Sequence, residues 1–386
     1  MTISPFAFRA VPTIEVCWEG ARRLGEIVAD RFNARKPLIV TDPGLVKAGL
    51  IAPIAASMKS AGLDVLVFDN IVPDPPETAI HDALSAARTH GADIVVGLGG
   101  GSSLDVAKVV AVQLGTGQPL AEMYGIGKVK GARLPLLLVP TTAGTGSEVT
   151  NISIITTGES TKMDVVSPQL YADLVVLDAQ LTIGLPKLHT AATGIDAMVH
   201  AIEAYTGQAK KNPLSDLFAR EALRLLTGNL IAACRDGSNR DAREAMLLGA
   251  TLAGQAFANS PVAAVHALAY PLGGHYHVPH GLSNALMLAP VLRFNAKAAA
   301  RLYAELADAL ALPGSGTAET RASALIVHME KLIADSGVPR RLSDVGVTRE
   351  SLPMLAADAM KQTRLLVNNP IEVREQDALA LYGEAF

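Results

Sequence analysis

The chain has 386 residues, of which 49% are hydrophobic and 18% are charged. This balance is typical of a well-packed globular protein with one large or two smaller domains, and it excludes an intrinsically disordered chain. The formal net charge is −4, with acidic and basic residues interspersed, and the lack of a Lys/Arg-rich block argues against a nucleic-acid partner.

The apolar runs and the N-terminal residues give no sign of export or membrane insertion. The N-terminus lacks the basic start and long apolar stretch of a signal peptide. Apolar runs such as 134–139 fall far short of the about 20 residues of a membrane-spanning helix. The two cysteines, Cys17 and Cys234, form no CxxC pair and suit a reducing compartment. We therefore expect a cytoplasmic protein with no membrane partner.

The first half of the sequence alternates short β-branched runs with helical stretches. Strands are predicted at 36–42, 63–69, 93–100, 134–140 and 173–178. Helices are predicted from the first of these strands to about Gly62, and over 76–91 and 103–115. Such alternation predicts βαβ units, and hence a parallel sheet with helices on both faces.

The second half changes character after the break at 184–186. From Lys187 onward the pattern is rich in Ala and Leu and almost entirely helical, with breaks at 207–213, 279–281 and 312–316. We therefore predict an α/β domain over residues 1–186 and an all-helical domain over residues 187–386.

Two glycine-rich loops follow predicted strands. The segment GLGGGSSLDVAK (97–108) opens a helix whose first amides suit a pyrophosphate, although Ser102 departs from the GxGxxG pattern and an ordinary strand-to-helix turn is the alternative. The segment PTTAGTGSEVTN (140–151) offers several hydroxyls beside two glycines. Both loops should lie at the carboxyl ends of parallel strands, where nucleotides bind, so together they favour a nucleotide site.

Asp42 ends the first predicted strand, in the sequence TDPG. A carboxylate at this position can accept hydrogen bonds from a ribose 2′-hydroxyl and repels a 2′-phosphate, which favours NAD over NADP. A turn-forming Asp before Pro43 explains the same residue equally well.

A candidate metal site comes from the helical half. Asp196 and His200 are four residues apart in GIDAMVHAIEAY, a spacing that puts both side chains on one face of a helix. His266 and His280, from a histidine-rich stretch further on, could complete four ligands. Three imidazoles and one carboxylate suit Fe(II), Zn(II) or another first-row divalent metal. A helix-surface ion pair is the alternative for Asp196 and His200.

Taken in order, four segments resemble the iron-containing (group III) alcohol dehydrogenase family. They are GGGSSLDVAK, PTTAGTGSEVT, GIDAMVHAIEAY and VHALAYPLGGHYHVPHG, and the resemblance covers about residues 36–295. It implies an N-terminal Rossmann-like α/β domain and an all-helical C-terminal domain, the fold shared with dehydroquinate synthase. It also implies an NAD-linked enzyme acting on a small alcohol or aldehyde, with Fe(2+) or alternatively Zn(2+), in a homodimer or larger homo-oligomer.

The resemblance also implies which residues form the sites. The metal ligands would be Asp196, His200, His266 and His280. The cofactor-binding residues would be Asp42, Asp74, Gly99, Gly100, Gly101, Ser102, Thr141, Thr142, Thr145, Asn151 and Lys162.

One departure from the family pattern concerns the residue thought to assist proton transfer. Many members carry a histidine four residues after the third metal ligand, whereas Tyr270 stands at that place here. Either Tyr270 takes part through its hydroxyl, or His275 or His277 serves, or solvent carries the proton. We take Tyr270 and His277 as the candidate catalytic residues.

Three other functions are compatible with parts of the pattern. A maleylacetate reductase, which reduces a C=C bond with NADH, shares overlapping motifs. A dehydroquinate synthase-like lyase should need more basic residues to hold a phosphate substrate than the helical half supplies. A non-catalytic nucleotide- or metal-binding protein would bind NAD without turnover.

Overall fold

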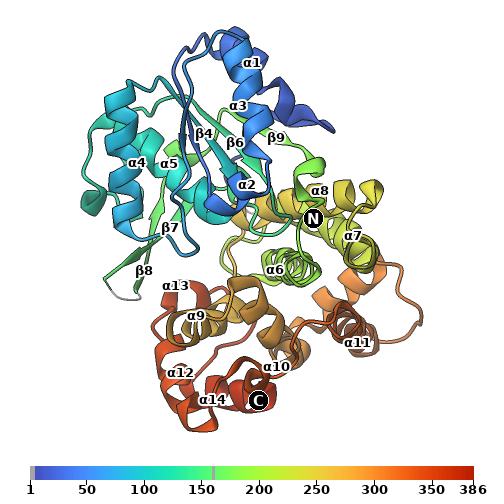
Figure 1. The fold of residues 1–386 in the computed structure, drawn as a ribbon. Helices are drawn as coiled ribbons and strands as arrows, with labels where there is room; N and C mark the ends of the chain where they lie inside the picture. Colours follow the sequence, from blue (N-terminus) through green and yellow to red (C-terminus); the bar gives the residue numbers. More distant parts are fainter. Residues whose placement is uncertain (1–4, 159–160) are drawn as a thin grey trace. The chain divides into compact units, whose positions relative to one another are not determined.

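A computed structural model describes residues 5–158 and 161–386 of the chain (Figure 1). The described chain forms two compact units. One is an α/β unit over Ala10–Gly184, and the other is a helical unit over Leu185–Phe386 that also includes the described residues before Ala10. The predicted fold class, a parallel α/β domain followed by an all-helical one, is confirmed.

The α/β unit is built on a six-stranded sheet whose strands pair in parallel. The order across the sheet is β1-β9-β6-β4-β2-β3. Their bounds are Ile14–Val16 (β1), Leu174–Leu177 (β9), Leu136–Pro140 (β6), Ile94–Gly99 (β4), Pro37–Val40 (β2) and Leu66–Phe68 (β3). The inner strands are buried on both faces, which explains their continuous apolar sequence. All five predicted strands are present, and β1 was not predicted because it is a three-residue edge strand with alternate residues exposed.

Helices cover both faces of this sheet (Figure 1). On one face, α1 (Leu24–Glu26) and α3 (Ile51–Ser60) pack with alternate residues of the strands in one apolar cluster. On the other face, α5 (Gly101–Thr116) packs against β4, where a Cβ on Gly97 would lie 2.8 Å from Ala107. The remaining helices are α2 (Pro43–Lys47) and α4 (Glu77–His90), with short helical turns at Gly20–Arg23, Ile27–Arg31, Leu120–Glu122, Ser147–Val149, Pro168–Leu170 and Ala179–Thr182.

A second, three-stranded sheet belongs to the same unit and was not predicted. Its order is β5-β8-β7, with β5 at Gly125–Ile126, β8 at Thr161–Val166 and β7 at Ile152–Thr157. β7 and β8 form an antiparallel pair, and both strands alternate between more and less buried residues. Their sequences, ISIITT and TKMDVV, mix polar and apolar residues, so neither strand has the continuous apolar run that predicts a buried strand.

The helical unit is organised around α6 (Lys187–Thr206), which is buried over most of its length. It packs against α7 (Pro213–Arg235), α8 (Arg240–Asn259) and α10 (His280–Ala309). Gly194 allows this close packing, since a Cβ there would lie 2.6 Å from both Leu230 and Met246. The other helices are α9 (Ala264–Tyr276), α11 (Ala318–Ser336), α12 (Leu352–Ala359), α13 (Thr363–Leu366) and α14 (Glu375–Ala385), with turns at Leu342–Val345 and Arg349–Ser351.

The N-terminal segment joins the helical unit through its backbone. The amide of Arg9 donates to Asn259 Oδ1 at 2.8 Å, and Asn259 Nδ2 and Gln255 Nε2 donate to the Arg9 carbonyl. The predicted α/β domain began at residue 1, whereas these bonds place the described residues before Ala10 with the helices. The predicted boundary at residue 186 lies close to the division between Gly184 and Leu185.

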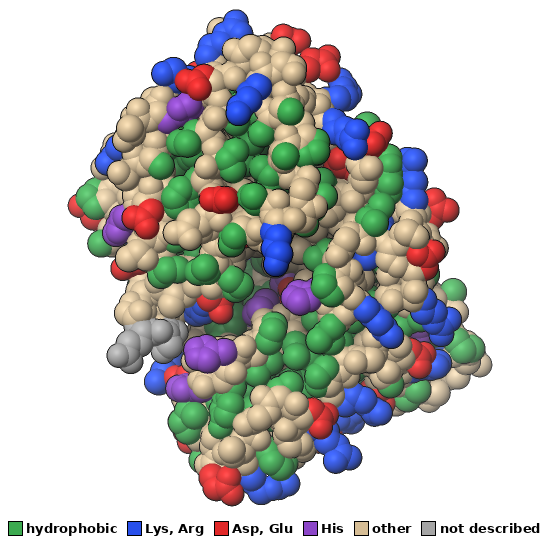
Figure 2. Space-filling model, in the orientation of Figure 1, with side chains coloured by type: hydrophobic (Ala, Val, Ile, Leu, Met, Phe, Trp, Pro, Cys, Tyr) green, Lys and Arg blue, Asp and Glu red, His purple; other side chains and the backbone are tan. Residues whose placement is uncertain are grey.

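Two surface features bear on possible partners. Among the described helices, none combines the length and apolar character needed to cross a membrane. On the face drawn in Figure 2, Lys and Arg side chains are interspersed with Asp and Glu, and the described residues form no continuous basic patch there.

Candidate metal centre and cofactor loops

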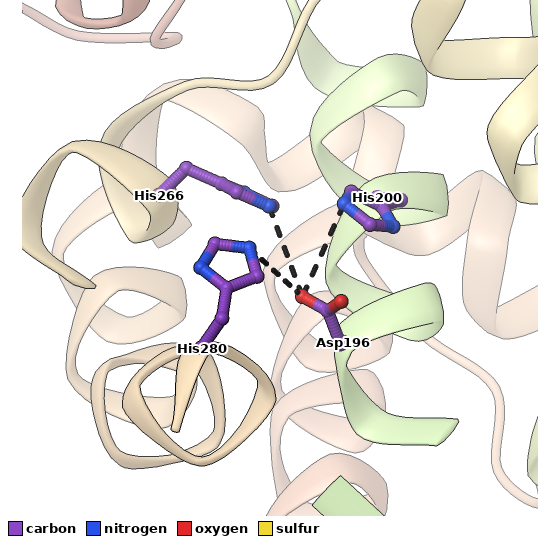
Figure 3. Close-up of side chains that lie close together, drawn as sticks. All are labelled: Asp196, His200, His266 and His280. Carbon is purple, nitrogen blue, oxygen red and sulfur yellow. Dashed lines mark ion pairs between the residues drawn. The ribbon is translucent and has the colours of Figure 1, made fainter. Parts of the chain in front are cut away.

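Four side chains of the helical unit converge on one point (Figure 3). Asp196 and His200 come from successive turns of α6, as their spacing predicts. His266 lies in the first turn of α9, and His280 is the first residue of α10. Gly281 lets α10 begin this close to α6, because a Cβ there would lie 2.6 Å from the Ala192 carbonyl oxygen.

Asp196 is the common neighbour of the three imidazoles. Its Oδ1 lies 3.9 Å from His200 Nε2, 3.8 Å from His266 Nε2 and 3.6 Å from His280 Nε2. One ligand atom from each of the four residues lies within 4.8 Å of the others. Asp196, His200 and His266 are buried, whereas the His280 side chain is 40% exposed. The structure therefore brings the four predicted residues together in a cluster in which His280 is the member exposed to solvent.

The electrostatics of this cluster are set by Asp196. Burial by itself would raise the pKa of Asp196, but the neighbouring imidazoles and a hydrogen bond from Asn284 outweigh burial and lower it. A carboxylate so placed stays ionised and can serve as an anionic ligand.

The donor set fits a divalent transition metal. Imidazole nitrogens and a carboxylate oxygen are ligands of Fe(II) and Zn(II), and ligand type does not choose between them. Ligand atoms arranged tetrahedrally around such an ion are about 3.4 Å apart. The distances from Asp196 Oδ1 to the three Nε2 atoms are 3.6–3.9 Å, slightly longer than this value. Small side-chain movements would therefore bring the four ligand atoms to the separations that a bound ion requires.

Two polar side chains that the sequence reasoning missed touch this cluster. Asn284 Nδ2 donates to Asp196 Oδ1 at 2.5 Å and lies 3.2 Å from both His266 Nε2 and His280 Nε2. Glu203 accepts from His266 Nδ1 at 2.7 Å. The spacing in the sequence could have indicated both residues, since Glu203 follows His200 by three residues and Asn284 follows His280 by four, which places each on the same helix face as a predicted ligand.

The two candidate catalytic residues lie in different surroundings. The Tyr270 ring is half-buried, and its centroid lies 5.9 Å from the centroid of the His280 ring, so the tyrosine ring is a neighbour of the cluster. His277 is exposed in a left-handed conformation (φ 53°) at the C-terminal end of α9. His275, the further alternative, lies 3.0 Å from Asp358.

In the α/β unit, the two glycine-rich loops are in contact, as predicted. Gly100 precedes α5, and a Cβ on it would lie 3.6 Å from Thr142. A Cβ on Gly101 would lie 2.9 Å from Thr145, so only glycine fits there. The Thr141 amide donates to the Gly99 carbonyl, which holds the two strand ends in register. Ser102 lies in the first turn of α5.

Asp42 faces the same strand ends while capping a helix. Its side chain accepts from the Leu45 amide at 3.1 Å, which caps α2. A Cβ on Gly99 would lie 3.6 Å from Asp42 Oδ2. Asp42 therefore has the local structural role expected of an Asp before Pro43, here as the cap of α2. The same carboxylate also lies beside the first glycine-rich loop.

The remaining predicted cofactor residues lie around the second sheet. Lys162 on β8 pairs with Asp74 at 2.7 Å and donates to Thr156 at 2.8 Å. Asp74 has a positive φ of 54°, in the loop that approaches β7 through the bridge between Pro76 and Thr156. Asn151 directly precedes β7. Asp74 and Lys162 are thus joined although they are far apart in sequence.

A fully buried lysine, which the sequence reasoning did not single out, connects the two glycine-rich loops. Lys108 on α5 donates to Ser147, Thr150 and the Ile152 carbonyl at 2.8, 3.1 and 2.7 Å. Asp105, one turn earlier, accepts from Ser147 Oγ and the Ile154 amide. Burial lowers the pKa of Lys108, and the nearby carboxylates oppose this shift. The pair therefore fixes the second loop against the helix that begins at the first.

Comparison with known proteins decides the family. The family description "Iron-containing alcohol dehydrogenase" matches residues 12–179, and "Fe-containing alcohol dehydrogenase family, C-terminal" matches residues 190–386. The chain belongs to the iron-containing alcohol dehydrogenase family. As such it is an oxidoreductase, and the predicted metal and NAD requirements agree with this family.

Relatives of this alcohol dehydrogenase match nearly its whole length. Long-chain-alcohol dehydrogenase 1 of Geobacillus thermodenitrificans is 41% identical over 92% of this chain and 91% of its own. The crystal structure of a 1,3-propanediol oxidoreductase superposes with a TM-score of 0.95 at 34% identity, covering 99% of this chain and 100% of that one. Sulfoacetaldehyde reductase from Bifidobacterium kashiwanohense, solved in complex with NAD+, gives a TM-score of 0.89 at 28% identity and covers 99% of each chain.

Replacing Lys108 by Met tests the connection between the loops. Asp105 would lose its buried cation, which should destabilise the α/β unit by about 3 kcal/mol. The loosened loops should weaken NADH binding by roughly tenfold. Calorimetric titration with NADH and thermal unfolding measure both effects, with Lys59→Met on the exposed side of α3 as the control. Unchanged NADH affinity in Lys108→Met would contradict a role for Lys108 in positioning the two glycine-rich loops for cofactor binding.

Proposed function

We propose that this alcohol dehydrogenase transfers a hydride between a small alcohol and NAD at a metal held by Asp196, His200, His266 and His280. The observation that carries the proposal is the convergence of these four side chains, with their ligand atoms within 4.8 Å, from three helices. Iron(II) is the metal we expect from the family, with zinc as the alternative.

The chemistry divides between the cofactors and the chain. When bound, the divalent metal lowers the pKa of the substrate hydroxyl and NAD accepts the hydride. The protein's own residues orient the substrate and take up the proton that the hydroxyl loses. Tyr270 is the residue we assign to relay this proton, its hydroxyl receiving it while passing its own proton to solvent, because its ring adjoins His280, the exposed member of the cluster.

The cofactor site that we propose follows the glycine-rich loops. Gly99, Gly100, Gly101 and Ser102 would receive the pyrophosphate at the start of α5, with Thr141, Thr142 and Thr145 beside it. Asp42 would accept from the ribose 2′-hydroxyl, Asn151 and Lys162 would approach the ribose, and Asp74 would line the adenosine pocket. The contacts between Gly100 and Thr142 and between Gly101 and Thr145 support this arrangement.

The substrate class that we propose is alcohols and their aldehydes. The names of the relatives cover a long-chain alcohol, 1,3-propanediol, lactaldehyde and sulfoacetaldehyde, so the family accommodates chains of different length and charge. These names favour an alcohol dehydrogenase over a C=C reductase of the maleylacetate type. Rates of NADH oxidation with a panel of aldehydes and with maleylacetate distinguish the two.

We further propose a cytoplasmic homodimer or larger homo-oligomer. Cys17 and Cys234 are both free thiols, Cys17 being exposed, which suits a reducing compartment. The size of the protein in solution, measured by sedimentation, tests the oligomeric state.

Replacing His266 by Ala tests the metal assignment. One imidazole fewer in the cluster should remove most of the bound metal and lower the rate of alcohol oxidation by about 10³-fold. Elemental analysis of the purified protein measures the metal. His275→Ala is a matched control, because it removes an exposed histidine from the same helix. NADH binding should persist in both variants, and full metal content in His266→Ala would overturn the assignment.

Replacing Asp42 by Ser tests cofactor choice. Serine preserves the cap on α2, since its hydroxyl can also accept from the Leu45 amide. Loss of the negative charge should raise the preference for NADPH relative to NADH by roughly tenfold, equivalent to about 1.4 kcal/mol. The ratio of kcat/KM values for the two cofactors measures it. An unchanged ratio would mean that Asp42 acts only as a helix cap.

Replacing Tyr270 by Phe tests the route of the proton. Without the hydroxyl, kcat for alcohol oxidation should fall by about 10²-fold while metal content stays the same. Tyr270→His should restore turnover, since an imidazole can accept the same proton. If Tyr270→Phe is fully active and His277→Ala is impaired, the proton passes through His277 instead.

A further inference from the structure

A buried carboxylate stands beside the four proposed metal ligands without being one of them. Glu203 lies on α6 with only 4% of its surface exposed. Asp196, His200 and Glu203 follow one another at intervals of four and three residues, so all three project from one side of the helix. A carboxylate this deeply buried requires hydrogen-bond donors.

Its donors all come from the beginning of α9. Glu203 Oε1 accepts from the Val265 amide at 2.6 Å, and Oε2 accepts from the Ala263 amide at 2.9 Å. The residue before α9 is Ala263, which has no side chain to cap the helix. Glu203 therefore supplies that cap from another helix, and its charge faces the positive end of the α9 dipole.

The third bond of Glu203 fixes a histidine ring. Glu203 Oε2 lies 2.7 Å from His266 Nδ1, so the carboxylate accepts a proton carried on that nitrogen. The opposite ring nitrogen, Nε2, lies 3.2 Å from Asn284 Nδ2, which can only donate, and this neighbour suits a lone pair on Nε2. Both neighbours select the same tautomer, with its lone pair directed toward Asp196 and the other ligands.

We propose that Glu203 is a positioning residue of the metal centre: it holds His266 in the Nδ1-protonated tautomer and attaches the start of α9 to the helix that carries Asp196 and His200. The inference rests on the proposed function, because it takes His266 as a ligand. Carboxylates that accept from the second nitrogen of a ligating histidine typically contribute about 10- to 100-fold to metal affinity.

Glu203→Gln is the variant that separates these effects. The amide keeps the volume and one acceptor, so a backbone amide of α9 can still be capped. Its NH₂ group would meet either His266 Nδ1, where it favours the tautomer protonated at Nε2, or the Val265 amide, and in both orientations the negative charge that holds the proton on Nδ1 is lost. The affinity for Zn²⁺, measured on the metal-free protein against a competing chelator, should fall about 10- to 100-fold.

Glu305→Gln is the matched control. Glu305 is in the same unit and accepts from the Tyr205 hydroxyl at 2.7 Å, so its neutralisation changes the charge equally without touching α9. The control should retain the affinity of the unmodified protein for Zn²⁺. Equal losses of affinity in both variants would overturn the proposal, because net charge would then explain the effect.

A spectroscopic measurement separates positioning from general loss of structure. In the Zn²⁺-loaded protein, ¹⁵N spectra of the histidine rings should show His266 protonated at Nδ1. In Glu203→Gln that resonance should shift or disappear, whereas the signals of His275 and His277 should not. An unchanged His266 signal together with unchanged Zn²⁺ affinity would overturn the role of Glu203.

A double variant keeps this inference distinct from the proposed function. In a His266→Ala background, Glu203→Gln should cost much less Zn²⁺ affinity than in the unmodified protein, since its effect on the tautomer passes through His266. The same loss in both backgrounds would show that Glu203 acts through another route. If His266→Ala alone keeps full metal content, the ligand assignment fails first, and the proposal for Glu203 fails with it.

Discussion

Burial of the Asp196 carboxylate is the constraint on which the helical unit depends. Only 1% of Asp196 is exposed, and an ionised carboxylate removed from water must be compensated by close positive or donating groups. The structure supplies one donor, the Asn284 amide, and places three imidazoles around the carboxylate, with which they would share a divalent cation. The packing of the helices and the chemistry of the site are therefore linked, because α6, α9 and α10 must pack closely for the carboxylate to remain charged.

Small residues make that packing possible. Gly281 allows the first turn of α10 to approach the α6 backbone, and Gly194 allows α7 and α8 to approach α6 from another side. A larger side chain at Gly281 would move the start of α10, and with it His280, away from Asp196, whereas one at Gly194 would displace the side chains of Leu230 and Met246. The functional importance of the two glycines thus comes from the distances they permit between other residues.

The α/β unit also buries an ionic group, which in this unit is a cation. Lys108 is fully buried, and its ammonium group is satisfied by Asp105, two hydroxyls and one carbonyl. Both units therefore contain a buried ionic group that connects segments distant in sequence, one beside the two glycine-rich loops and one within the cluster of Asp196 and the three histidines. In each unit the ionic group fixes the geometry of a proposed binding site as well as contributing to the fold.

The sequence by itself determined five of the six strands of the larger sheet, the helical second half and the four clustered residues. Continuous β-branched runs specify buried parallel strands, and a spacing of four residues puts Asp196 and His200 on one helix face whatever surrounds them. Only the tertiary structure revealed β1, the sheet formed by β7 and β8, and the roles of Glu203, Asn284 and Lys108. These features depend on partners far away in the chain, up to about 160 residues for the pairing of β1 with β9, and a polar residue on a helix reveals such a partner only once the chain is folded.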